Sequence, residues 1–200
     1  MSKFDRTTIK IVADETLSKG WSHLRKVTFD YTNDAQQTHR LTWEVFDRGE
    51  AVAMLLFDPS RQTVVMVRQF RIPAYVNGDP AFLLEVPAGG TEGGDPLAAA
   101  CREVLEETGY QIDAPRHLFS AYMSPGSVTE KVHFYYAAVS AAQKVETGGG
   151  LEDEHEDLEL LDIDLDAALA MIATGEICDG KTIMLLQWAS LNRASLSGAE

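Results

Sequence analysis

The stretch "LEVPAGGTEGGDPLAAACREVLEETGY", residues 84–110, joins an apolar β-like start to a glycine-rich loop and then to an acidic helical pattern. Asp95 and Pro96 are typical N-cap and first-turn residues of a helix. Gly109 stands where a left-handed glycine would end that helix. We therefore expect a strand, a loop and a helix in this order, with three glutamates on the helix.

The three glutamates would share one side of the helix. At 100° per residue, Glu106 and Glu107 fall about 60° and about 40° to either side of Glu103. The opposite side carries Ala98, Cys101 and Leu105. Like charges one turn apart destabilise a helix by roughly 0.2–0.5 kcal/mol, and Arg102 can relieve part of this through its i,i+4 pairing with Glu106. Two interpretations remain open: a solvated acidic face, or a set of hard oxygen ligands for a cation such as Mg²⁺.

The composition limits the classes of function. The net charge of -14, from 31 acidic and 17 basic residues, disfavours binding of a nucleic acid backbone. Cys101 and Cys178 are too few for a disulfide framework or a thiolate metal cage, which favours a reducing compartment. The N-terminal residues lack an apolar leader, and no apolar run is long enough to span a membrane. We expect a cytoplasmic protein that binds neither nucleic acid nor membrane.

The remaining chain predicts an α/β (α+β) protein. Three extended segments within residues 7–47 predict a small antiparallel sheet, so residues 1–47 are interpreted as an N-terminal β-sheet region. Residues 48–200 contain further β-rich runs before and after the acidic helix: "AVAMLLFD", "TVVMVRQFRI", "FLLEVPAGG", "HLFSAYM" and "KVHFYYAAV". Two segments near the end have helical spacing: "LDAALAMIATG" and "GKTIMLLQWASLNRA". A mixed sheet flanked by helices is the simplest packing.

The segment "REVLEETGY", residues 102–110, together with the glycines before it, resembles the Nudix box. This is the signature of hydrolases that cleave a diphosphate linking a nucleoside to another group. Asp95 stands where the box usually has glutamate, and its spacer to Arg102 is one residue short, so we interpret Asp95 as the helix cap. The resemblance implies a Nudix-type α/β/α sandwich with a mixed sheet in residues 48–200, preceded by the small antiparallel sheet. It also implies a requirement for Mg²⁺, with Mn²⁺ as an alternative.

The resemblance assigns roles to the acidic helix. Glu103 and Glu107 are predicted as direct metal ligands, joined by the backbone carbonyl of Ala88. Glu106 would bind a second ion or accept a hydrogen bond from Arg102. All four helix residues are predicted to act in catalysis. The glycine-rich loop supports this interpretation, since glycines let backbone groups come close to a ligand.

A second acidic run, "LEDEHED", spans residues 151–157. Taken alone, it reads as a solvated loop. In Nudix hydrolases a glutamate on a late loop serves as general base or extra metal ligand, so the resemblance favours Glu154, followed by Asp153 and Glu152. The glycines at 148–150 would give this loop the freedom to move.

Longer segments resemble one branch of the family, the bacterial GDP-mannose pyrophosphatases. They include "VRQFRIPAYVNG", "AYMSPGSVTEKVHFYYA", "GGGLEDEHE" and "TGEICDGKT", and the branch shares the short spacer before the box arginine. The implied reaction is hydrolysis of GDP-mannose to GMP and mannose 1-phosphate. ADP-ribose pyrophosphatases share the "RQFR" and "SPG" pieces, so cleavage of ADP-ribose to AMP and ribose 5-phosphate is the alternative. A non-catalytic nucleotide-sugar sensor is a third hypothesis.

The same branch implies a set of substrate-contacting residues. Arg71 offers a planar fork suited to a diphosphate. Glu44 could accept hydrogen bonds from guanine, while Trp21 could stack on a base or lie buried in the core. Glu130 and Lys181 align with sugar or phosphate contacts, and a loop hydrogen bond or a solvated charge is the alternative for each. The full predicted set is Trp21, Glu44, Arg71, Ala88, Glu130, Asp153 and Lys181.

The resemblance also implies a homodimer in which the N-terminal sheet takes part. Apolar strands within residues 7–47 need a surface to cover them, which a second subunit or the chain's own domain could supply. The expected partners are therefore a small nucleotide sugar and a second copy of the chain.

Overall fold

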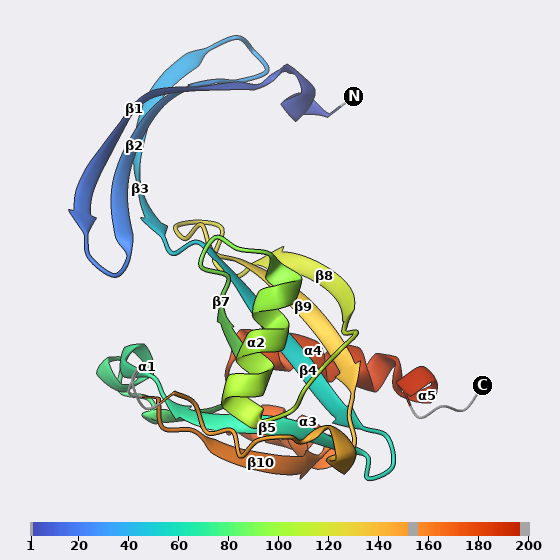
Figure 1. The fold of residues 1–200 in the computed structure, drawn as a ribbon. Coiled ribbons are helices and arrows are strands. Elements are labelled where there is room, and N and C mark those ends of the chain that lie inside the picture. Colours follow the sequence, from blue (N-terminus) through green and yellow to red (C-terminus); the bar gives the residue numbers. More distant parts are fainter. Residues whose placement is uncertain (1, 152–155, 197–200) are drawn as a thin grey trace. The chain divides into compact units, whose positions relative to one another are not determined.

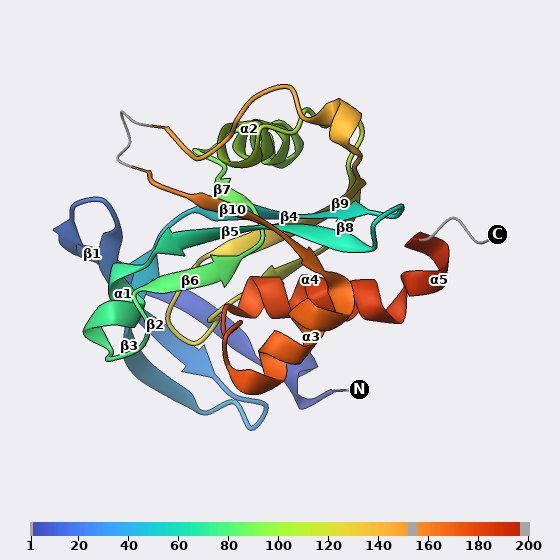
Figure 2. The same ribbon diagram turned by 90° about the horizontal axis from the view of Figure 1, so that it is seen from below.

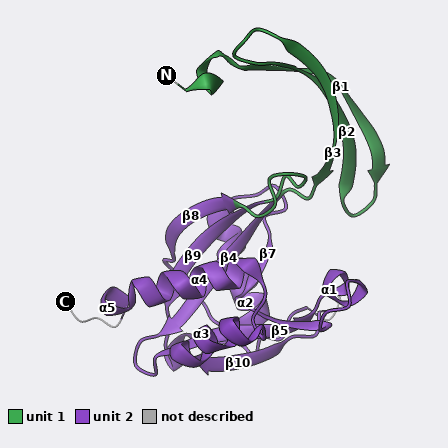
Figure 3. Cartoon of the chain, turned by 180° about the vertical axis from the view of Figure 1, so that it is seen from behind, with its two compact units in different colours: residues 1–49, 122–130 green, residues 50–121, 131–200 purple. Residues whose placement is uncertain are grey.

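The computed structural model describes residues 2–151 and 156–196. The chain divides into two compact units, shown in Figure 3. Unit 1 comprises residues 1–49 and 122–130, and unit 2 comprises residues 50–121 and 131–200. Within the described ranges, the helices are all too short or too polar to cross a membrane.

Unit 1 is built on a three-stranded antiparallel sheet with the strand order β1-β2-β3. Its elements are η1 (Lys3–Arg6), β1 (Thr8–Lys19), β2 (His23–Thr32) and β3 (Thr38–Asp47). Cross-strand pairs fix the register, because Arg40 bonds Asp30 at 2.8 Å and Phe29 packs edge-on against Trp43 with ring centroids 5.4 Å apart. The predicted N-terminal antiparallel sheet is confirmed.

The loop of residues 122–130 belongs to unit 1 because it is bonded to the end of β3. Phe46 N–H donates to the Ser127 carbonyl at 2.8 Å, and Thr129 N–H donates to the Phe46 carbonyl at 3.0 Å. The Thr129 hydroxyl also donates to Asp47 at 2.8 Å. The backbone ladder and this side-chain bond together make the loop an extension of the small sheet.

Unit 2 is built on a seven-stranded mixed sheet (Figure 1). Its strands are β4 (Glu50–Asp58), β5 (Thr63–Phe70), β6 (Phe82–Glu85), β7 (Ala88–Gly90), β8 (Arg116–Tyr122), β9 (Lys131–Ala138) and β10 (Glu159–Asp164). The main path runs β10-β5-β4-β9-β8, with β6 paired to β5 and β7 paired to β4. The β4 and β9 pair is parallel, whereas β4 is antiparallel to β5 and to β7. Residues 52–57 of β4 are at most 1% exposed and form the centre of the core.

Helices cover both faces of this sheet. Figure 2 shows α2 on one face and α3 and α4 on the other. The helices are α1 (Ile72–Val76), α2 (Pro96–Thr108), α3 (Leu165–Thr174), α4 (Gly180–Leu191) and α5 (Arg193–Leu196), with the short η2 (Ala141–Gln143). The predicted α/β/α sandwich with a mixed sheet is confirmed. The sequence did not predict α1 or the edge strand β10, which follows directly on the acidic run.

The ends of α2 form as the sequence predicts. Asp95 accepts a hydrogen bond from Ala98 N–H at 2.9 Å, so it caps the first turn. Gly109 follows the helix with a φ of 74°, the left-handed conformation of a C-terminal glycine.

The buried face of α2 is not the side opposite the glutamates. The helix buries Ala99, Ala100, Val104, Glu107 and Thr108. On the opposite side, Ala98 is exposed and Cys101 and Leu105 are only partly covered. Small side chains on the buried face let the helix lie close to the sheet. Glu107 lies on the same face and is therefore buried as well. One of the three glutamates is therefore not on a solvated face at all.

Candidate active site

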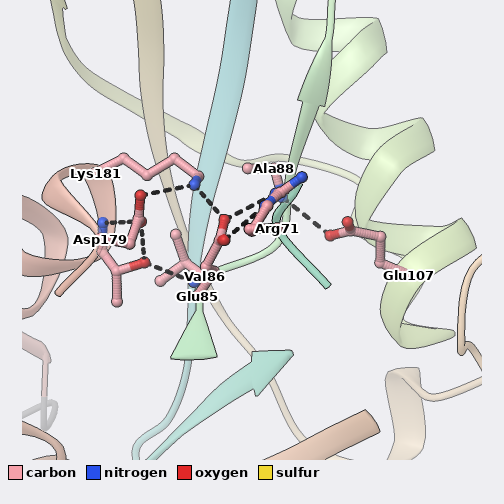
Figure 4. Close-up of polar contacts among 8 residues, drawn as sticks. Arg71, Glu85, Val86, Ala88, Glu107, Asp179 and Lys181 are labelled. Atoms are coloured by element: carbon pink, nitrogen blue, oxygen red, sulfur yellow. Dashed lines mark hydrogen bonds and ion pairs between the residues drawn. The ribbon is translucent and has the colours of Figure 1, made fainter. Parts of the chain in front are cut away.

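The segment of residues 85–88 joins two groups of charged side chains in unit 2. On one side, Ala88 N–H donates to the Glu107 carboxylate at 3.0 Å. On the other side, Val86 N–H donates to the Thr182 hydroxyl near the start of α4 at 2.9 Å. Val86 and Ala88, separated by one residue in the same strand connection, thus bond to helices on opposite faces of the sheet, as Figure 4 shows for Glu107.

The first group, here called the acidic cluster, consists of Glu103, Glu106 and Glu107 on α2. Glu107 is 2% exposed. Within the described part of the chain, its carboxylate accepts the Ala88 bond but is paired with no cation. Burial raises the pKa of Glu107 to about 8, against the opposing effect of the Ala88 N–H, and the charge of Glu103 adds to the rise.

Glu103 and Glu106 are both paired with Arg102. The guanidinium donates from Nη2 to Glu103 at 2.8 Å and from Nη1 to Glu106 at 2.9 Å. The predicted i,i+4 pairing of Arg102 with Glu106 is therefore confirmed. Burial nevertheless raises the pKa of Glu103 to about 7, since its effect outweighs that of Arg102, and repulsion from Glu106 adds to the rise.

Gly89 brings the backbone against the acidic cluster. A Cβ atom at this position would lie 2.0 Å from the carboxyl carbon of Glu103 and 2.2 Å and 2.3 Å from its oxygens. Any residue with a side chain would displace the carboxylate, so only glycine fits here without rearrangement. The glycine-rich loop and the helix are thus in direct contact at Glu103.

The oxygen atoms of this region suit the ligand preference of a hard divalent cation. Two carboxylates carry raised pKa values because their negative charges are buried near each other, and a cation would remove that cost. No group of three or more His, Cys, Asp and Glu side chains stands ready to hold a metal among residues 2–151 and 156–196. Carboxylates from α2 would therefore be completed by backbone oxygen, waters or substrate, as is usual for Mg²⁺.

The glycines at 148–150 have a packing role that the sequence did not predict. Gly149 N–H donates to the Glu107 carbonyl at 2.9 Å, and Gly150 N–H donates to the Glu106 carbonyl at 3.2 Å. A Cβ at Gly148 would lie 2.5 Å from the backbone of Thr108. The glycines thus allow close packing against the end of α2 and satisfy its last carbonyls.

The acidic run after these glycines is described only in part. Glu154, Asp153 and Glu152 lie outside the described residues. Glu156 is described, and its charge contributes to the raised pKa of both Glu103 and Glu107. The run therefore brings negative charge to the acidic cluster through a residue that the sequence did not single out.

The second group, here called the ionic cluster, consists of Arg71, Glu85, Asp179 and Lys181 (Figure 4). Glu85 ends β6, is 1% exposed, and accepts from Arg71 Nε at 2.7 Å and Nη2 at 2.8 Å. Lys181 donates to the same carboxylate and also to Asp179 at 3.0 Å. Figure 4 shows Glu85 between the two cations.

The ionic cluster keeps its charges. Burial would raise the pKa of Glu85, but Arg71 and Lys181 outweigh it and hold that pKa below its usual value. Burial would likewise lower the pKa of Lys181, and the carboxylates of Glu85 and Asp179 hold it above its usual value instead. Asp179 is also the N-cap of α4, where it accepts from Thr182 N–H at 2.9 Å.

The other predicted substrate residues lie in unit 1. Glu44 lines a pocket of about 450 Å³ together with Trp43, Tyr122 and residues 125–129. Glu130 ends the same loop, and its carbonyl accepts from Met123 N–H at 3.4 Å. The sequence identified Glu44 but missed the two aromatic residues beside it.

Trp21 lies outside that pocket. It occupies the turn between β1 and β2 and is 96% exposed, with the Arg48 guanidinium 5.6 Å from its ring. The alternative that Trp21 is a buried core residue is therefore wrong. An exposed aromatic ring remains available for stacking.

Sequence reasoning missed the residues that support the ionic cluster. Arg71 and Lys181 were predicted, but Glu85, which bonds both, was not. Its signal is weak but present: a single carboxylate stands within the apolar run "FLLEVP". A charge inside a buried strand needs partners, so this position could have been singled out.

Comparison with known proteins identifies the family. The model of the NUDIX domain matches residues 47–185, well over half of the chain. The chain therefore belongs to the Nudix family, whose members are hydrolases that generally require a divalent metal ion. A second model, described as the GDP-mannose pyrophosphatase NudK N-terminal domain, matches residues 8–46.

Curated relatives match almost the whole chain. A protein of Yersinia enterocolitica named GDP-mannose pyrophosphatase is 46% identical over 185 residues, which are 92% of this chain and 96% of the relative. Proteins of the same name are 45% identical in Citrobacter koseri, over 90% of this chain and 94% of the relative, and in Yersinia pestis, over 92% of each.

Proposed function

We propose that this Nudix hydrolase cleaves GDP-mannose with water to give GMP and mannose 1-phosphate. The assignment of the substrate rests on the similarity to proteins named GDP-mannose pyrophosphatase. This similarity covers both the N-terminal region and the Nudix domain. In the reaction one P–O bond of the diphosphate bridge breaks, and water supplies the oxygen of the new phosphate group. We propose that the reaction takes place in the cytoplasm.

We assign the side chains of unit 2 to two roles, metal binding and phosphate binding. Glu103 and Glu107, with the Ala88 carbonyl, would hold the Mg²⁺ or Mn²⁺ ion, and Arg102 would keep Glu103 and Glu106 in place. When bound, the ion would offset the negative charge of the phosphate oxygens and of the buried glutamates. Arg71 and Lys181 would bind phosphate oxygens, since both keep their charge and Arg71 is 38% exposed.

The residues of unit 1 would contact the rest of the substrate. Glu44 lies in a pocket beside an aromatic ring, Trp43, so it could accept hydrogen bonds from a base or a sugar there. Trp21 and Glu130 stay predictions as stacking and sugar-contacting residues. Glu154 stays the predicted general base, with Asp153 as a predicted substrate contact.

A direct assay tests the proposal. Purified protein would be given GDP-mannose, ADP-ribose and UDP-glucose in parallel with Mg²⁺, Mn²⁺ or EDTA, and the products identified by mass spectrometry. We expect GMP and mannose 1-phosphate to form with the highest kcat/KM, and no turnover in EDTA. A preference for ADP-ribose by about tenfold, equal to roughly 1.4 kcal/mol in transition-state binding, would overturn the substrate assignment. Binding without hydrolysis would favour a nucleotide-sugar sensor.

We further propose that residues 1–47 form the contact of a homodimer. One face of the small sheet exposes large apolar side chains, including Ile9 at 65%, Ile11 at 57% and Trp43 at 58%. They line a groove of about 490 Å³ in which the described side chains are all apolar or aromatic: Ile9, Ile11, Val27, Phe29, Tyr31, Leu41, Trp43 and Val45. A contiguous apolar face of this kind is typical of an interface.

Measurement of the mass in solution tests the dimer. Light scattering coupled to size-exclusion chromatography should give twice the 22.0 kDa chain mass. Ile11→Glu should shift the protein toward the monomer, whereas Lys10→Glu, at the neighbouring strand position, should not. A monomeric parent protein at assay concentrations would contradict the proposal.

A further inference from the structure

Glu85 holds the two cations of the ionic cluster with one buried carboxylate. Its Oε1 and Oε2 accept from Arg71 Nε and Nη2 at 2.7 Å and 2.8 Å, a bidentate pairing that fixes the plane of the guanidinium. Its Oε2 also accepts from the Lys181 ammonium. Arg71 follows β5 and Lys181 lies in the first turn of α4, so Glu85 joins elements that are far apart in the sequence.

The pairing leaves part of Arg71 available. The side chain of Glu85 is 1% exposed, whereas that of Arg71 is 38% exposed. Among the described residues, Arg71 Nη1 makes no hydrogen bond or ion pair, so one edge of the guanidinium is held and the other is free. Arg71 is also near enough to Glu107 for each charge to shift the pKa of the other. The charge of Arg71 thus lies within electrostatic range of the acidic cluster.

The charges of the ionic cluster balance without a ligand. Arg71 and Lys181 are matched by Glu85 and Asp179, so the buried groups need no phosphate to be stable. A diphosphate would therefore add to an arrangement that already exists, and the arginine would not need to be ordered on binding. Binding sites with preset donors lose less conformational entropy when the ligand arrives.

We propose that Glu85 is a positioning residue, which sets Arg71 and Lys181 in the geometry that binds the diphosphate of the substrate. This rests on the proposed function, in which those two cations bind phosphate oxygens. Glu85 itself touches no substrate, because its carboxylate is buried behind the cations. Its loss should weaken diphosphate binding and leave the acidic cluster unchanged, since Glu107 is bonded to the backbone of Ala88.

Kinetics of Glu85→Gln test this inference. We expect KM for GDP-mannose to rise by about tenfold or more while kcat changes by less than about threefold. Affinity for Mn²⁺, measured by electron paramagnetic resonance, should stay that of the parent protein. Glu159→Gln is the matched control, because Glu159 pairs at 2.7 Å with Arg68 of β5, the strand that precedes Arg71, but is exposed. The control should keep the parent KM.

A double-mutant cycle separates positioning from a structural role. If Glu85 acts in part through Arg71, then Glu85→Gln should raise KM by a smaller factor in an Arg71→Ala background than in the parent protein. A lower melting temperature with unchanged KM in Glu85→Gln would overturn the inference. An undiminished effect in the Arg71→Ala background would overturn it as well.

Two further measurements keep the test decisive. Should Glu85→Gln not fold, Glu85→Asp retains the charge but is one methylene shorter, so it cannot keep its present distances to both cations. The same rise in KM is expected, and a parent-like KM would contradict the inference. If the parent protein hydrolyses none of the nucleotide sugars, the proposed function fails, and calorimetric binding of GDP by the parent and Glu85→Gln then tests the positioning role by itself. Equal affinities would refute it.

Discussion

Glu85 and Glu107 are both almost fully buried, yet their environments act on them in opposite ways. Glu85 is bonded to two cations, which hold its pKa below the usual value. Glu107 is bonded to one backbone N–H, and burial raises its pKa to about 8. Glu85 begins the strand connection of residues 85–88, and Glu107 is bonded to Ala88 at its end.

The difference shows that burial of a carboxylate does not by itself reveal its task. Where the fold supplies the cations, as at Glu85, the charge is already compensated and the group stabilises a fixed arrangement. Where the fold supplies none, as at Glu107, the charge is costly until a cation comes from solution. The second situation is typical of metal-binding and catalytic sites.

The largest expected effect comes from Glu107→Gln. Removal of this charge should lower kcat/KM by at least about 10²-fold, because the remaining ligands would hold the metal poorly. The fold should persist, since a glutamine oxygen can still accept from Ala88 N–H. Steady-state kinetics and circular dichroism measure the two properties. A folded variant with near-normal turnover would show that Glu107 is not part of the catalytic centre.

The acidic cluster and the ionic cluster should contribute oppositely to the pH dependence of stability. The folded pKa values of about 7 for Glu103 and about 8 for Glu107 exceed the unfolded value of 4.5. The folded state therefore holds extra protons at intermediate pH, and the unfolding free energy of the metal-free protein should fall as pH rises from 5 toward 9. We expect the melting temperature in EDTA to drop on the order of 5 °C over this range, and Mg²⁺ to reduce the drop.

Glu85 should give the opposite slope. Because its folded pKa lies below the unfolded value, its contribution is present above that value and is lost as pH falls through the folded pKa. In Glu107→Gln the loss of stability toward pH 9 should shrink, while the acid side stays unchanged. Equal slopes in the parent and this variant would contradict the assignment of the effect to Glu107.

A smaller effect is expected from Thr182→Val, next to the ionic cluster. The variant leaves Val86 N–H without its acceptor in a buried position, which costs about 1–3 kcal/mol in unfolding free energy. Urea denaturation measures the loss. Because this bond also fixes residues 85–88, KM should rise modestly while Mn²⁺ affinity is kept. A variant as stable as the parent would show that water or another group replaces the hydroxyl.

The smallest expected effect comes from Asp95→Ala. Loss of the N-cap bond to Ala98 should lower the unfolding free energy by about 1 kcal/mol. The KM and the metal affinity should stay those of the parent, because Asp95 is a helix cap and not a ligand. A marked fall in metal affinity would instead make Asp95 part of the metal site.

The local pattern of residues 84–110 was enough to predict the strand, loop and helix and both helix caps. The pattern did not predict which side of α2 is buried, because angles around a helix axis show which residues share a side but not which side meets the sheet. In the folded protein, the side of α2 that carries Ala100 and Val104 packs against β4. Glu107 lies on that side and is buried with them. Similarly, nothing local in the sequence reveals that Gly148 closely approaches the end of α2.

Side-chain contacts of the candidate site were predictable within one helix and were missed where they join distant parts of the chain. Glu103, Glu106 and Arg102 are neighbours in the sequence, so their pairing follows from helix geometry. Glu85 and Lys181 are 96 positions apart, and only the folded sheet brings them together. The sequence gives no distance for such a pair.

The contacts of residues 85–88 also make the length of this connection a fixed quantity. Pro87 has no N–H that would need a partner, and its carbonyl accepts from Met54 of the central strand at 3.0 Å. From Glu85 to Ala88 the chain covers three residues, at most about 10 Å of extended backbone. An insertion or deletion of one residue here would shift the following chain by about 3.3 Å and turn its side chains to the other face. Homologous chains should therefore vary in residue type along this connection far more readily than in its number of residues.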